Sequence, residues 1–308
     1  MRASTAMPTT LAADHAGLSA EQAIETDRFT LQLHPSRSDW TEIENWMSRE
    51  GWDPGFGDAS AILALDPGAL VIGLLDATPI SAISVLQVSG LYAVLGNYLV
   101  HPDYRGRGFG LATWRAALPH AGSRVVALDA VPDRVGTYEA AGFTPAHTTI
   151  GYHGTIRAGR IADARGIRPL EAGDSAAAAG LDALCSPFER SAFLAVWCAA
   201  SGTRTLVYED RRGQVVGFGA IRPSRSGYRI GPLIAETPQA AGALFDALTS
   251  PLEGEDVVLN VPEPNTSGCE LARERGLLRA SHTIRMYSHP VRPAALAHCY
   301  SIASLAWG

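Results

Sequence analysis

Short alternations of apolar and polar residues run along most of this chain of 308 residues, and glycine, proline and acidic turns separate them. A period of two predicts strands, and apolar positions three or four residues apart predict helices. In the first half the pattern predicts strands at 29–33, 69–75, 79–87, 91–100 and 124–131, helices at 38–49, 111–118 and 134–141, and a closing hairpin within 144–152. Strands and helices in this order predict an α/β or an α+β fold, and the pattern alone does not choose between the two.

The second half repeats this order of elements. Gly142 and Gly276 each follow a predicted helix, where a glycine commonly ends one, and aligning them superimposes the two halves. A repeat of this length is a duplicated domain rather than a solenoid unit. We therefore expect a disordered tail at 1–27, a first domain at 28–154, a linker at 155–166 and a second domain at 167–308. In the second domain the predicted strands are 166–170, 205–209, 215–221, 228–234, 256–261 and 282–288, and the predicted helices begin at Ser175, Thr237 and Thr266.

Composition narrows the class of function. With 46% hydrophobic and 18% charged residues the chain is ordinary globular material, and its length favours two domains. A net charge of −6 gives no overall basic field, so no nucleic-acid partner is expected. Without an apolar run of about 18 residues or a secretory leader, we expect no membrane partner and a cytoplasmic protein. The four cysteines form no Cys-x-x-Cys pair, and no metal site is expected.

One glycine-rich turn carries candidate chemistry. Arg105-Gly106-Arg107-Gly108-Phe109-Gly110 lies between a predicted strand and a predicted helix. The free amides and the dipole at a helix start attract an anion, and glycines let the backbone approach it closely. A flexible loop is the alternative interpretation. The glycine spacing excludes the dinucleotide fingerprint, and the absence of Gly-Lys-Ser/Thr excludes a P-loop.

Together with Val100-His101-Pro102 before it, this turn resembles the acyl-CoA signature Arg-x-x-Gly-x-Gly of the GNAT superfamily of N-acyltransferases. The wider chain is similar to bacterial tandem GNAT proteins whose second half has diverged. The matching segments are 50–55, 105–110, 128–131, 229–233 and 261–265. The resemblance implies two tandem GNAT-like domains, each a central mixed, mostly antiparallel sheet flanked by helices. It also implies an acyltransferase that uses an acyl-CoA donor, with acetyl-CoA as the default.

The resemblance assigns the donor contacts to the first half. Backbone amides at Leu99 and Val100 would bind the thioester carbonyl, and Ala112 would pack at the helix start. The diphosphate would be held by the cradle, Arg105, Gly106, Arg107, Gly108, Phe109, Gly110 and Leu111. The second half has Ile234 to Pro238 at the matching place, with no glycine and with Glu236, so a cradle is expected only in the first half.

Two residues are candidates for the catalytic chemistry. Tyr138 occupies the place of the family tyrosine that protonates the departing thiolate, although a purely structural role is the alternative. Asp129 could face the gap as a base acting through water, anchor a cationic substrate, or be a structural aspartate. Val131 stands where many members carry an asparagine, whereas the second half keeps Asn265 there. Donor contacts on that side are therefore less certain.

The segment 46–58 mixes aromatic side chains, carboxylates and turn residues, which suits an amine acceptor or a structured loop equally. Its candidate residues are Trp46, Glu50, Trp52 and Asp58, and Glu263 of the second half could join them. We expect direct acetyl transfer to the primary amine of a small molecule through a ternary complex. A non-catalytic acyl-CoA sensor and a protein-interaction platform are the alternatives. The sequence leaves the oligomeric state open, including a homodimer.

Overall fold

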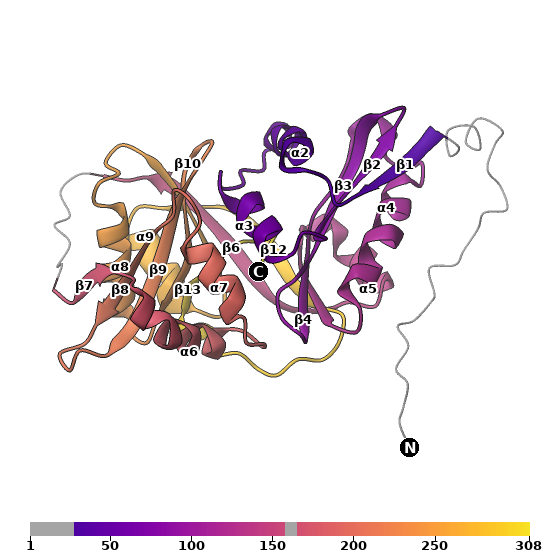
Figure 1. Cartoon of the computed structure of the whole chain (residues 1–308). Helices are drawn as coiled ribbons and strands as arrows, with labels where there is room; N and C mark the ends of the chain where they lie inside the picture. The colour runs from indigo at the N-terminus through magenta and orange to yellow at the C-terminus, as the bar shows by residue number, and fades with distance from the viewer. Residues whose placement is uncertain (1–27, 158–164) are drawn as a thin grey trace, which may run out of the picture.

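The computed structural model describes residues 28–157 and 165–308 (Figure 1). The expected tail at 1–27 lies outside the described residues, as does the middle of the expected linker at 155–166. Among the helices of the described part, none combines the length and the apolarity that crossing a membrane requires.

Thirteen strands of the described residues join in one sheet, in the order β1-β2-β3-β4-β5-β12-β6-β11-β10-β9-β8-β7, with β13 beside β10. The first-half strands are β1 (Phe29–Leu33), β2 (Leu70–Leu75), β3 (Thr78–Gln87), β4 (Tyr92–Val100), β5 (Val125–Ala130) and β6 (Thr144–Thr155). The second-half strands are β7 (Ile167–Pro169), β8 (Arg204–Glu209), β9 (Val215–Ser224), β10 (Gly227–Ala235), β11 (Asp256–Pro262), β12 (Leu278–Tyr287) and β13 (Cys299–Ser301).

Helices cover both faces of this sheet, as the GNAT resemblance implies. One face carries α4 (Phe109–Ala117), α5 (Val135–Ala140), α8 (Pro238–Thr249) and α9 (Thr266–Glu274), whose apolar residues form two separate cores, one in each half. The other face carries α2 (Arg37–Arg49), α3 (Asp58–Leu65), α6 (Ser175–Cys185) and α7 (Ser191–Cys198). These four share a single core, which contains Trp40 of α2 and Trp197 of α7 and so joins the two halves (Figure 1).

The two halves exchange their last long strands. β6 pairs with β11, from Thr155↔Asp256 to Thr149↔Pro262, while β12 pairs with β5, from Ala130↔Ile284 to Ala127↔Tyr287. The expected hairpin within 144–152 is therefore wrong, because this segment is one long strand whose partners, β11 and β12, both lie in the second half. Each half completes the sheet of the other, and β6 and β12 cross between the halves in Figure 1.

The central parallel strands of each half separate part-way along their length. β4 and β5 pair only from Tyr92↔Val125 to Val94↔Ala127, and β4 then bulges between Gly96 and Leu99. β10 and β11 pair only as far as Ile230↔Leu259, and β10 bulges before Leu233. A bulge bends its strand and disrupts the ladder locally. Each half thus contains a gap between its two central strands.

Candidate functional site

The predicted cradle forms an uncapped helix start. Gly108 is the N-cap of α4 with a φ of 87°, and within residues 28–157 and 165–308 no side chain caps the first amides of that helix. The first intrahelical bond runs from Ala112 N to Gly108 O, so the amides of Phe109, Gly110 and Leu111 have no partner within the helix. A Cβ on Gly106 or Gly108 would meet no atom of the described part of the chain within 4 Å. The space beside these two glycines is therefore open, as the close approach of an anion to the helix start requires.

Gly110 is required for a different reason. A Cβ at this position would lie 2.7 Å from the Tyr98 hydroxyl and 2.7 Å from Val100 Cγ2. Glycine thus lets the first turn of α4 press against β4. This contact fixes the helix start beside the open end of the β4–β5 gap.

Both cradle arginines are held in place. Arg105 donates from Nε to Val100 O at 2.9 Å and pairs with Glu50 at 3.0 Å. Arg107 donates to Asp103 O, and its guanidinium lies 5.2 Å from the Tyr104 ring. Arg105 therefore links the cradle to the end of α2, which the sequence could not indicate.

The strand β4 supplies backbone amides to the gap. His101 N donates to Ile80 O of β3, and Leu99 is the next residue of β4 on the same side. Because alternate residues of an antiparallel pair bond across it, the Leu99 amide belongs to the β3–β4 ladder. The amides of Val100 and Tyr98 point the other way, toward β5. The Leu99 amide is thus engaged within the sheet, whereas the donor contact at Val100 stays a prediction, and Tyr98 is a further candidate that sequence reasoning missed.

Tyr138 and Tyr98 flank the same tryptophan. The Tyr138 and Tyr98 rings lie 5.9 and 5.6 Å from the ring of Trp114 on α4. Burial, reinforced by the neighbouring Tyr98 and opposed by Arg134, raises the pKa of Tyr138 to about 12. Burial also raises the pKa of Tyr98. Both phenols therefore remain hydrogen-bond donors at neutral pH, on the α4 side of the gap.

Asp129 differs from the expectation of an open carboxylate. Its side chain is fully buried, its Oδ2 lies 2.5 Å from Arg285 Nη2 on β12, and its Oδ1 accepts from Thr283. Burial raises the pKa of Asp129, while the Arg285 charge opposes that rise. The carboxylate is thus committed to a side chain of the other half. A base or an anchor at this position would have to break that ion pair.

The expected substrate residues lie in different surroundings. Asp58 is 3% exposed and paired with Arg222 of β9 at 2.6 Å, and Glu50 is paired with Arg105. These pairings correct the expectation that both carboxylates are free to bind an amine. Trp46 is 5% exposed, its Nε1 has no partner among the described residues, and its ring lies 5.7 Å from His101 at the end of β4. Trp52 is 38% exposed.

Glu263 is exposed and lies away from these residues. It follows β11, and its amide donates to Thr148 O of β6. β12 and β6 stand between β5 and β11 in the sheet, so Glu263 is separated from β5 by about 14 Å at the usual strand spacing. The structure does not bring it together with Trp46 or Tyr138.

The matching helix start in the second half is closed. Thr237 is the N-cap of α8, and its side chain accepts from the Ala240 amide at 3.2 Å. Pro238 at the first helical position has no N–H to offer. In α8, the helix that corresponds to α4, the cap thus takes one of the first amides and proline removes another.

The gap of the second half is also filled. β13 pairs with β10 at Leu233↔Ser301 and Ile234↔Cys299, and Ile302 N donates to Asn260 O of β11. Asn265, which keeps the family asparagine, donates to Cys299 O and so holds β13 in place. A strand of the chain itself thus occupies the space between β10 and β11.

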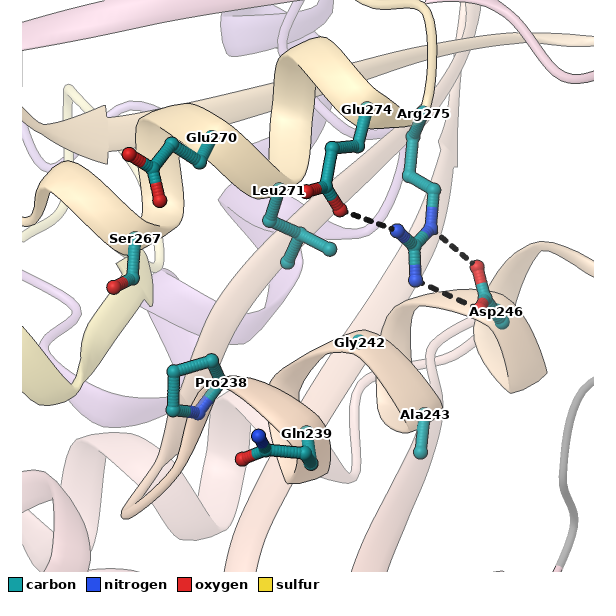
Figure 2. A pocket seen from close by; sticks show the side chains of 10 residues that line it. All are labelled: Pro238, Gln239, Gly242, Ala243, Asp246, Ser267, Glu270, Leu271, Glu274 and Arg275. Carbon is teal, nitrogen blue, oxygen red and sulfur yellow. Dashed lines mark hydrogen bonds and ion pairs between the residues drawn. The ribbon is translucent and has the colours of Figure 1, made fainter.

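An acidic cleft of about 490 Å³ lies between α8 and α9, the counterparts of α4 and α5. Figure 2 shows Glu270 and Glu274 on α9 and Asp246 on α8 around it. Arg275 binds Asp246 through two hydrogen bonds of 2.8 and 2.9 Å and also reaches Glu274. Three carboxylates against one arginine would repel a diphosphate.

Comparison with known proteins agrees with this geometry. Residues 30–143 match the model of the acetyltransferase (GNAT) family, and residues 178–301 match the model of an acetyltransferase (GNAT) domain. The chain is a tandem GNAT protein. The two GNAT matches and the similarity to a named acyltransferase show that this protein is an acyltransferase enzyme.

Relatives of this tandem GNAT protein span nearly its whole length. Holothin acyltransferase of Pseudoalteromonas sp. (strain SANK 73390) is 28% identical over 277 residues, which cover 89% of this chain and 92% of the relative. A putative acetyltransferase from Pyrococcus horikoshii has the same fold, with a TM-score of 0.77, 19% identity and coverage of 96% and 100%. A tandem GNAT protein from the clavulanic acid biosynthesis pathway has a TM-score of 0.56, 15% identity and coverage of 85% and 98%.

Proposed function

We propose that this tandem GNAT protein transfers an acetyl group from acetyl-CoA to the primary amine of a small molecule, at one site in the first half. The carrying observation is the contrast between the two helix starts. The start of α4 has no side-chain cap and has open space beside Gly106 and Gly108, whereas α8 is capped and its gap is filled by β13. We also propose that the chain divides into domains at 28–154 and 167–308, and that the second domain is a scaffold for the first.

The residues of the first half have separable tasks in this reaction. The cradle amides bind the diphosphate, and the amides of Val100 and Tyr98 hydrogen-bond the carbonyl oxygen as it gains negative charge. The amine nitrogen attacks the carbonyl carbon, the C–S bond breaks, and the amine loses one proton while the thiolate gains one. Tyr138 lies on the side of the gap where it would donate a hydrogen bond to that sulfur. The bound donor supplies the thioester that makes this exchange favourable.

The acceptor is proposed to bind as a neutral amine. Three of the four carboxylates expected to hold a cation, Glu50, Asp58 and Asp129, are each paired with an arginine. The fourth, Glu263, follows β11 and is separated from β5 by two strands. An ammonium group entering beside these pairs would lose hydration without gaining a free partner. The relative from Pseudoalteromonas is named for acyl transfer to holothin, and we carry over only the coarse part of that name, a small-molecule acceptor.

A panel of amines tests this function. Release of CoA from acetyl-CoA is followed at pH 7 with arylamines, which are neutral, and with alkylamines of equal size, which are protonated. We expect amine-dependent release, faster with the arylamine of each pair. Acetyl-CoA binding without release above the amine-free control would favour the sensor instead. Faster release with the alkylamines would contradict the neutral acceptor alone.

A further inference from the structure

The segment that follows β13 continues from the second half into the first. A Cβ on Gly231 of β10 would lie 2.2 Å from Ile302 O, so the segment leaves the filled gap against the bulge of β10. It then reaches β4, because a Cβ on Gly96 would lie 2.2 Å from Ala306 O. Figure 1 places the C-terminal end near the centre of the molecule, close to where β6 and β12 cross between the halves.

Residues 306–308 cover β4 at the place where its gap begins. β4 parts from β5 after Val94 and bulges from Gly96, and Gly308 lies beside Val94 while Ala306 lies against Gly96. Backbone rests directly on backbone here, with no space for a methyl group. The amides that face the gap, those of Tyr98 and Val100, follow within four residues on the same strand.

Trp307 anchors this contact in the core that joins the two halves. Its side chain is 2% exposed and belongs to the same core as Val94, Leu99 and Ala127, which are at most 4% exposed. These residues belong to the core on the face of the sheet opposite to α4. A donor whose diphosphate lies at α4 and whose carbonyl lies at the β4 amides directs its acyl chain toward that packed face.

We propose that residues 306–308, anchored by Trp307, form the end wall of the acyl pocket and restrict the donor to short acyl groups. This proposal rests on the proposed function, because it needs the donor in the first-half gap. In a close-packed interior every added methylene must displace atoms. One misplaced methylene in an apolar pocket changes selectivity by roughly 10-fold to 200-fold.

Calorimetric binding of acetyl-, butyryl- and octanoyl-CoA tests the wall without needing an acceptor. The three donors share the CoA moiety, so differences in Kd report the acyl chain. We expect wild-type protein to bind octanoyl-CoA at least about tenfold more weakly than acetyl-CoA. Trp307→Leu should reduce that difference by about tenfold. The matched control is Trp40→Leu, because Trp40 is equally buried in the same core but lies on α2.

The outcomes separate this proposal from the function on which it rests. Equal affinity of the wild type for all three donors would refute residues 306–308 as the end wall, and the proposed acetyl transfer would be unaffected. The same loss of selectivity in Trp40→Leu would overturn it too, because the effect would then be general loosening of the core. No binding of acetyl-CoA by the wild type would instead overturn the proposed function. If Trp307→Leu does not fold, Trp307→Phe and the wild-type series still decide the matter.

Discussion

At the scale of residues, the site is shaped by which polar groups are already engaged. Three of the four carboxylates that the sequence offered for amine binding, Glu50, Asp58 and Asp129, are each held by an arginine, and two of these arginines come from the other half. The fourth, Glu263, is exposed and lies away from them. Tyr138 keeps its proton instead, because burial raises its pKa to about 12. The first half thus presents hydrogen-bond donors around the gap rather than free acids.

The Tyr138→Phe variant tests the donor at the sulfur. It removes one hydroxyl and keeps the ring contact with Trp114, so the fold and the KM for acetyl-CoA should change little. We expect kcat to fall by roughly 100-fold or more, as for loss of a positioned acid. Because a raised pKa keeps the phenol protonated as pH rises, wild-type kcat should show no alkaline decline below about pH 11.

Tyr98→Phe is the matched control for this variant, because Tyr98 flanks the same tryptophan and its backbone amide is unchanged. Loss of activity in Tyr98→Phe with full activity in Tyr138→Phe would transfer the role to Tyr98. Full activity in both variants would refute a phenolic donor.

At the scale of elements, two short helices that the sequence did not reveal connect the halves. α3 and α7 are only eight residues long and mostly apolar, so neither shows a clear amphipathic period. α3 begins at Asp58, whose partner Arg222 also donates to Gly231 O and Ala303 O and lies 4.4 Å from the Trp197 ring. One guanidinium therefore ties α3, α7, β10 and the C-terminal segment together.

Breaking this junction should be costly. Asp58→Asn leaves the Arg222 charge buried without its counter-ion, and we expect a loss of about 3–5 kcal/mol in the free energy of unfolding. Denaturant titration followed by fluorescence measures it. Asp76→Asn, which removes the exposed pair with Arg28, is the control and should change stability little. Equal losses in the free energy of unfolding would show that the buried pair stabilises the fold no more than the exposed pair does.

Prediction from sequence succeeded where local signals decide the structure. The strands β1 to β5 and the helices α2, α4, α5, α8 and α9 have their expected order, because each has a clear period or a defined end. The cradle turn likewise follows from glycines at positive φ, at Gly106 and Gly108.

Prediction failed where distant segments choose their partners. Nothing in the alternation of 144–155 specifies whether β6 pairs within its own half or with β11. Cys299–Ser301 is too short to show a period, so β13 and its place in the second gap were missed. The arginine partners of Asp58 and Asp129 also come from far along the chain, which a single sequence does not reveal.

At the scale of the whole molecule, the duplication has produced two unequal halves in one continuous sheet. The exchange of β6 and β12 makes each half depend on the other, and the core on the α2 face is shared. The second half keeps the gap between its central strands but fills it with β13 and caps α8. We therefore propose that the second half supports the first rather than repeating its chemistry, which predicts one donor site per chain.

Calorimetric titration with acetyl-CoA tests that claim most directly. The wild type should bind one acetyl-CoA per chain, and Gly108→Glu should lose binding because it places a carboxylate where the α4 amides open. The matched control is Gly213→Glu, which adds the same charge and backbone strain at an exposed turn of the second half and should bind like the wild type. Two molecules bound per chain, or undiminished binding by Gly108→Glu, would contradict the account.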